Sequence, residues 1–126
     1  MQSKGFLLFL GAVLLLTGVA TAWLPHWSGT LYVLAVVGYL FRGKGWWALA
    51  AGGVVAIEWL VFALAWDIPN QGLLAERVAT LFGVTRPFLW GITAVVGFLL
   101  GGVGIGLGQA LAALLPQKPP RFRERR

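Results

Sequence analysis

The sequence predicts an all-α integral membrane protein, a four-helix bundle with a short amphipathic helix in its outer loop. Of the 126 residues, 59% are hydrophobic and 11% are charged, whereas soluble proteins carry about a quarter charged residues. A chain this short cannot bury so much apolar surface in one aqueous core. Thirteen of the fourteen charged residues lie between long apolar runs, and Glu58 alone lies inside one.

The first apolar run covers residues 5–23. It continues for 19 residues until Pro25 follows, and about 20 apolar residues suffice to cross a bilayer. Lys4 before the run and Ala20-Thr21-Ala22 at its end also fit a secretory signal with an A-x-A cleavage site. We expect a retained helix, because the run is long enough to span, and cleavage stays the alternative.

The second and third runs cover residues 27–41 and 46–66. The second has 15 residues, fewer than the usual minimum of about 17, so a re-entrant segment is an alternative to a span. The third has 21 residues and is bracketed by Trp46 and Trp66, as expected where a helix meets both membrane interfaces.

The only sizeable loop, residues 67–87, predicts an amphipathic helix over about 70–82. Its large apolar side chains share one helical face: Leu74, Val78, Leu81 and Phe82. Asp67 or Asn70 can cap the start, and Gly83 is placed for a left-handed end. We expect this helix to lie on the outer membrane surface or over the mouth of the bundle.

The last run, residues 88–115, has 28 residues and would be about 42 Å long as a helix. A hydrocarbon core is about 30 Å thick, so this helix must tilt, kink or project beyond the bilayer. Residues 116–126 then form a basic segment with three prolines. We expect a disordered cytoplasmic tail that touches anionic lipid headgroups.

The basic residues orient the four predicted spans. With the N-terminus inside, the inner side receives eight of the ten: Lys4, Arg42, Lys44, Lys118, Arg121, Arg123, Arg125 and Arg126. The outer side receives only Arg77 and Arg86. This bias follows the positive-inside rule and places both termini in the cytoplasm, and a re-entrant second run would spoil it.

A row of small residues in the last run predicts close helix packing. Its members recur every three or four residues: Thr93, Gly97, Gly101, Gly104 and Gly108. Gly52 lies on a similar face of the third run. Missing side chains let helix backbones approach in lipid, either within one chain or between subunits.

Glu58 is the candidate centre of an intramembrane polar site. A charged carboxylate at such depth costs roughly 2.5 kcal/mol or more, and no Lys or Arg lies inside a predicted span to pair with it. We expect a group that is protonated much of the time or that faces a water-filled cavity. Counting along the helices places Thr17, Tyr32 and Thr93 at a similar depth. Such a cluster is either a set of interhelical hydrogen bonds or a proton, cation or ligand site.

The sequence offers few residues for metal binding, cofactor binding or catalysis. The chain has no cysteine, and His26 is its only histidine, so we expect no metal site, no cofactor and no catalytic residue. The basic residues flank apolar runs instead of forming a stripe with aromatic side chains, which argues against a nucleic-acid partner. We therefore expect a protein that is not an enzyme.

The loop sequence Trp-Asp-Ile-Pro-Asn-Gln-Gly-Leu-Leu-Ala-Glu-Arg-Val-Ala-Thr-Leu-Phe, before a glycine-rich last span, resembles small multi-pass bacterial membrane proteins of no assigned activity. The resemblance implies a bacterial cytoplasmic (inner) membrane and carries over no catalytic residue. From the residues themselves we expect a structural or accessory component that self-associates or binds another membrane protein through its last span. The alternative is a small proton or cation channel or transporter that uses Glu58. A holin-like lesion former also fits the size and the basic tail.

Overall fold

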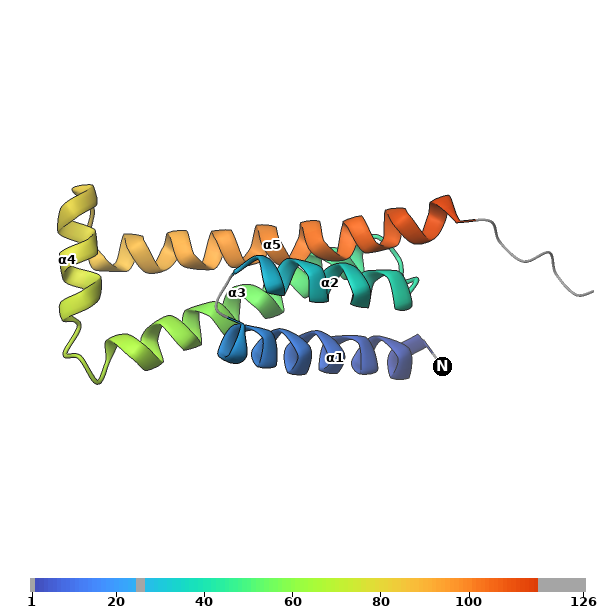
Figure 1. Ribbon diagram of the computed structural model, residues 1–126, viewed down its shortest axis with the longest axis horizontal. Coiled ribbons are helices and arrows are strands. Elements are labelled where there is room, and N and C mark those ends of the chain that lie inside the picture. The colour runs from blue at the N-terminus through green and yellow to red at the C-terminus, as the bar shows by residue number, and fades with distance from the viewer. Residues whose placement is uncertain (1, 25–26, 116–126) are drawn as a thin grey trace, which may run out of the picture.

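The computed structural model of the chain describes residues 2–24 and 27–115, and this part is all-helical, as predicted. Its helices in chain order are α1 (Gln2–Trp23), α2 (Ser28–Leu40), α3 (Trp46–Asp67), α4 (Leu73–Phe82) and α5 (Arg86–Leu114). Figure 1 shows α1, α2, α3 and α5 running side by side, with α4 lying across the end where α3 stops and α5 begins. The predicted tail, residues 116–126, lies outside the described residues.

Three of these helices are long and apolar enough to cross a membrane. The apolar stretches in α1, α3 and α5 have 20, 22 and 29 residues and mean hydropathies of 2.2, 2.0 and 2.0. Helix α2 has 13 residues, two fewer than the predicted run, because Trp27 precedes it and Phe41 leaves the helical conformation at φ −96°, ψ 87°. Thirteen residues rise only about 20 Å, so the count of four spans stays a prediction.

Helix α5 packs against α3 and α2, and α1 packs against the same two helices. The buried core draws on all four helices: Phe9, Val13, Leu34, Val37, Ala51, Val55 and Ile105. In Figure 1 the start of α1 and the end of α5 lie at the same end of the molecule, opposite α4. Helices α3 and α5 continue towards α4 beyond the end of α1 and the start of α2.

Glycines set how closely α5 approaches its neighbours. A Cβ on Gly101 would lie 2.7 Å from the Cα of Gly52 on α3, and one on Gly104 would lie 2.6 Å from the Cβ of Leu34 on α2. A Cβ on Gly108 would overlap the carbonyl oxygen of Ala35. The glycine row of α5 is therefore covered by α2 and α3 of the same chain, where no larger side chain fits.

Helix α4 begins and ends at glycines with left-handed backbone conformations. Gly72 precedes it at φ +74° and Gly83 follows it at φ +66°, so the predicted left-handed end at Gly83 is confirmed. The helix starts at Leu73, three residues later than predicted, because residues 68–72 form a turn.

The face of α4 that packs on the protein is its alanine face. Ala75 and Ala79 are buried, whereas Leu81 and Phe82 are 82% and 70% exposed. Small side chains let the α4 backbone lie close to the ends of α3 and α5. Of the large apolar side chains that predicted the helix, Leu81 and Phe82 face outward, whereas Val78 is half-buried.

Candidate functional site

Helix α3 presents the Glu58 side chain to α1. Glu58 is only 7% exposed, and its Oε2 is hydrogen-bonded to the hydroxyl of Thr17, which is fully buried. The neighbouring Gly18 leaves space for the other oxygen, since a Cβ there would lie 2.9 Å from Glu58 Oε1. The carboxyl group therefore lies flat against one turn of α1.

The Thr17 hydroxyl has one proton to donate and two possible acceptors, the Val13 carbonyl oxygen and Glu58 Oε2. Its Oγ1 lies 2.6 Å from the carbonyl oxygen of Val13 and also contacts Glu58 Oε2. If the hydroxyl donates to Val13, its oxygen accepts the proton of a neutral Glu58 carboxyl. If Glu58 is ionised, the hydroxyl donates to the carboxylate instead. The same contact thus accommodates Glu58 with or without its proton.

Three buried polar atoms near this contact have no hydrogen-bond partner among the described residues. They are Glu58 Oε1, Trp59 Nε1 on the same helix, and Thr21 Oγ1, one turn beyond Thr17 on α1. Unpaired buried groups of this kind are uncommon in native proteins and call for an explanation.

A cavity of about 260 Å³ adjoins this cluster on the side towards α4. Its walls come from α1, α2, α3 and the turn between α1 and α2: Thr21, Leu24, Trp27, Thr30, Trp59 and Phe62. Two of its lining residues, Thr21 and Trp59, carry the unpartnered atoms just described. At about 30 Å³ for each water, the cavity has room for several molecules.

The structure brings together two of the four residues expected at the polar site, Glu58 and Thr17. Tyr32 is 71% exposed on α2. Thr93 donates a hydrogen bond to the carbonyl oxygen of Leu89 at 3.1 Å and lines a different cavity, beneath α4. Counting residues gives the depth of a side chain but not the direction in which its helix is rotated, and this rotation turns Tyr32 and Thr93 away from Glu58.

Thr21, Thr30 and Trp59 were not predicted as site residues. Thr21 follows Thr17 by one helical turn, so a search for hydroxyls on the same face of α1 would have found it. Trp59 neighbours Glu58 in sequence, but its indole gave no signal of its own because tryptophan is common near membrane interfaces.

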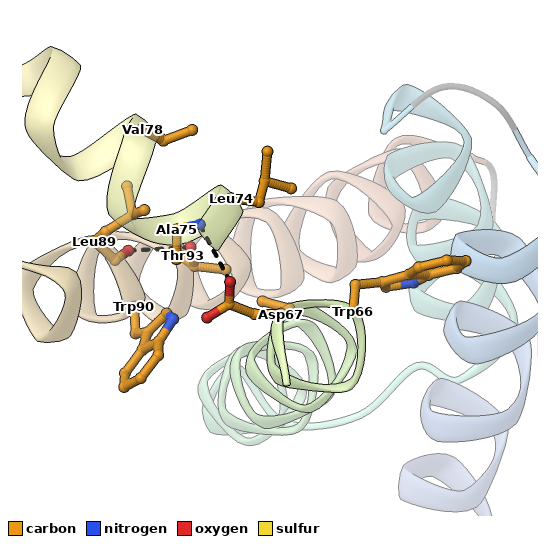
Figure 2. Close-up of a pocket in the computed structure, with 9 residues that line it drawn as sticks. Trp66, Asp67, Leu74, Ala75, Val78, Leu89, Trp90 and Thr93 are labelled. Atoms are coloured by element: carbon orange, nitrogen blue, oxygen red, sulfur yellow. Dashed lines mark hydrogen bonds between the residues drawn. The ribbon is translucent and has the colours of Figure 1, made fainter. Parts of the chain in front are cut away.

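The cavity beneath α4 measures about 210 Å³ and is mainly apolar (Figure 2). Its wall joins α3, α4 and α5: Ala63, Trp66, Asp67, Leu74, Ala75, Val78, Leu89, Trp90 and Thr93. Figure 2 shows the Asp67 carboxylate at the cavity wall, hydrogen-bonded to the backbone of Ala75.

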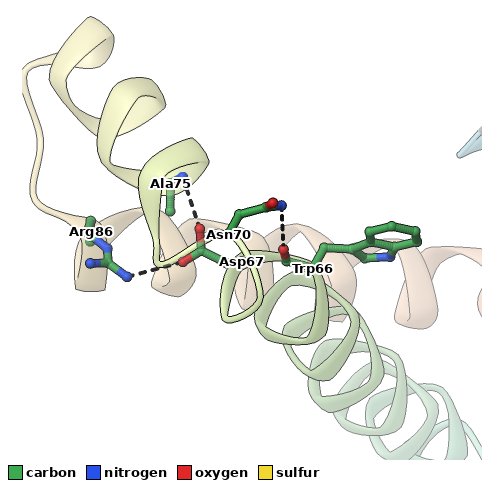
Figure 3. Close-up of polar contacts among 5 residues, drawn as sticks. All are labelled: Trp66, Asp67, Asn70, Ala75 and Arg86. Carbon is green, nitrogen blue, oxygen red and sulfur yellow. Dashed lines mark hydrogen bonds and ion pairs between the residues drawn. The ribbon is translucent and has the colours of Figure 1, made fainter.

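Asp67, the last residue of α3, is the centre of a second group of polar side chains. Its Oδ1 accepts the Ala75 N–H at 3.1 Å, and its Oδ2 lies 3.2 Å from Nη2 of Arg86 (Figure 3). Asp67 thereby caps the start of α4, and it was one of the two residues predicted to do so. The other candidate, Asn70, instead donates to the carbonyl oxygen of Trp66 at 3.0 Å.

Arg86 is held by more than this ion pair. Its Cζ lies 5.4 Å from the centre of the Trp90 ring, within the range of a cation–π contact. The guanidinium also covers the Cα of Gly72, where any Cβ would overlap it. These contacts make the Asp67 group a structural joint between three helices.

Comparisons with models of known protein families, with curated proteins and with solved structures give no match. The class of the protein therefore rests on its own features. It is an all-helical protein with three helices suited to crossing a membrane. Within the described residues, no group of three or more His, Cys, Asp or Glu side chains could hold a metal ion.

Proposed function

We propose that this protein is a structural or accessory component of the bacterial inner membrane that binds a second copy of itself or another membrane protein. In this proposal α1, α2, α3 and α5 all cross the bilayer, and both termini lie in the cytoplasm. Support comes from the charge bias, with eight basic residues on one side, and from the shared end at which α1 starts and α5 stops (Figure 1).

The surface proposed for binding is the open glycine step of α5. Its covered glycines already contact α2 and α3, whereas a Cβ on Gly106 would meet nothing within 4 Å. A Cβ on Gly102 would lie 3.7 Å from the carbonyl oxygen of Ala48, an ordinary contact distance. Gly102 and Gly106 are four residues apart, the spacing at which small residues let two helices approach in lipid. This pair carries the proposal.

The test is association in mild detergent, followed by cross-linking and native mass spectrometry. We expect a defined oligomer or heteromeric complex that is lost in Gly102→Ile/Gly106→Ile. Gly53→Ile is the matched control, because Gly53 of α3 also has nothing within 4 Å of an added Cβ. A wild-type protein that stays strictly monomeric and partnerless would refute the proposal, and so would equal loss in both variants.

A second function, proton or cation movement past Glu58, is supported by one observation. Glu58 Oε1 is buried without a hydrogen-bond partner among the described residues, and the next residue of α3, Trp59, lines the cavity between α1, α2 and α3. The test is ion flux in proteoliposomes. We expect flux in the wild type and its loss in Glu58→Gln, with Thr93→Val unaffected. Flux that is absent, or that persists in Glu58→Gln, removes this function.

A further inference from the structure

We propose that the cavity between α1, α2 and α3 is a water-binding vestibule that joins the Glu58–Thr17 contact to the aqueous side on which α4 lies. The vestibule is the cavity lined by Thr21, Leu24, Trp27, Thr30, Trp59 and Phe62. Its ligand is water, held between the polar groups of α1 and α3. Hydration of the vestibule requires neither the association nor the transport proposed above.

The unpartnered atoms are the first argument for water. Leaving a buried donor or acceptor unpaired costs about 1–3 kcal/mol. Here Thr21 Oγ1, Trp59 Nε1 and Glu58 Oε1 are unpaired together. A site that holds an ordered water needs two to four polar partners, and Thr21, Trp59 and the buried Thr30 line the vestibule itself.

The chemistry of the three atoms also suits water. The indole N–H of Trp59 can only donate, and an ionised Glu58 oxygen can only accept, whereas the Thr21 hydroxyl does both. A water molecule donates and accepts, so it can pair with all of them. An apolar occupant, such as a lipid acyl chain, would leave each of them unpaired.

Distances along α1 allow the vestibule to reach the carboxyl group. Thr21 lies one turn from Thr17, about 6 Å at the helical rise of 1.5 Å per residue. Two hydrogen bonds of about 2.8 Å that meet at one bent water span about 4.5 Å, so the bridge needs two waters, one of which reaches the carboxyl group. In this arrangement that water takes the place of the missing partner of Glu58 Oε1.

The rim of the vestibule is formed where α1 turns into α2. Leu24 and Trp27 there are 46% and 60% exposed. In Figure 1 the end of α1 and the start of α2 lie partway along α3 and α5, on the side of the molecule that faces α4. Water can therefore enter from that side without passing between the closely packed α3 and α5.

Cysteine labelling tests the vestibule directly, because the natural chain has no cysteine. We would place a single cysteine at Thr21 or Thr30 and add a charged, membrane-impermeant methanethiosulfonate to either side of oriented vesicles. Val19→Cys is the matched control, since Val19 is on the same turn of α1 as Thr21 but is 59% exposed on its outer surface. Thr80→Cys on α4 and Lys44→Cys between α2 and α3 report which side the reagent reaches.

We expect Thr21→Cys and Thr30→Cys to react from the side that labels Thr80→Cys, about tenfold or more faster than Val19→Cys, because a thiol in hydrocarbon forms little thiolate. Filling the vestibule with Thr21→Leu should slow the labelling of Thr30→Cys by a similar factor. Circular dichroism confirms that each variant is folded. Rates equal to Val19→Cys, or reaction only from the side of Lys44→Cys, would overturn the proposal.

The outcome is separate from those of the two proposed functions. A dry vestibule overturns this proposal and leaves the association result unchanged, whereas the flux proposal is decided by Glu58→Gln. A protein that neither associates nor conducts still labels at Thr21→Cys if the vestibule holds water.

Discussion

The Asp67 carboxylate and the Arg86 guanidinium, 19 residues apart in sequence, meet at 3.2 Å and join the last residue of α3 to the first residue of α5. Asp67 also accepts the N–H of Ala75, so the same side chain fixes the first turn of α4 (Figure 3). One carboxylate thus sets the positions of three helix ends.

Asp67→Asn should destabilise the protein. The amide can still accept the Ala75 N–H but loses the ion pair, and we expect a fall of about 1–2 kcal/mol in the free energy of unfolding, the lower part of the range because Arg86 is 37% exposed. The measurement is unfolding in mixed micelles of increasing denaturing detergent. Glu76→Gln, at an exposed charge on α4, is the control and should change stability by less than about 0.5 kcal/mol. Equal effects of the two substitutions would show that the ion pair contributes nothing measurable.

Gly72→Ala should be more harmful than Gly83→Ala, although both glycines have positive φ values. A Cβ at Gly83 meets open space, so only the backbone strain of about 1 kcal/mol applies there. At Gly72 the added Cβ also overlaps the Arg86 guanidinium, so the ion pair must shift. The same unfolding assay, together with proteolysis of the segment around α4, distinguishes the two. A larger loss at Gly83 would contradict the role given to Arg86.

Gly101→Ala should destabilise the contact between α3 and α5, whereas Gly106→Ala should be nearly neutral. At Gly101 the new methyl group would lie 2.7 Å from the Cα of Gly52, and overpacking of this kind costs about 1–3 kcal/mol. At Gly106 it meets nothing within 4 Å. Unfolding of the two variants in the same detergent decides the matter, and the prediction is wrong if their stabilities agree.

Thr17→Val should remove the hydrogen-bond partner of Glu58 at almost constant shape. We expect a loss of about 0.6–1.7 kcal/mol, the range measured for hydrogen bonds between helices in membranes. Thr93→Val is the control, since the Thr93 hydroxyl bonds only to the carbonyl of its own helix among the contacts seen here. If Thr17→Val is as stable as the control, the Thr17–Glu58 contact does not hold α1 to α3.

Most of the helices can be predicted from the sequence because a lipid environment imposes simple conditions on them. Apolar runs must be long, charges must lie between them, and prolines or glycines end them, so α1, α3 and α5 were found close to their observed limits. Helix α2 was harder, because Trp27 and Phe41 are as apolar as the helix they flank. Only the backbone conformation shows that they lie outside it.

The polar site was only half predictable, for a geometric reason. Residue counting placed Glu58 and Thr17 at one depth, and they do meet. It could not show that Tyr32 faces outward, because the rotation of α2 follows from the fit of Leu34 and Ala35 against the glycines of α5. Such a fit depends on the side chains of both helices, so it cannot be predicted from the sequence of either helix alone.

The glycine row of α5 also has a consequence for biosynthesis. The ribosome makes α5 after α1, α2, α3 and α4, and until it emerges the surfaces around Gly52 on α3 and Leu34 on α2 are not covered by it. Helices α1, α2 and α3 are therefore made as an incomplete assembly whose surface for α5 is still uncovered. Docking of α5 covers that surface, and a chain interrupted before Gly97 would leave it exposed.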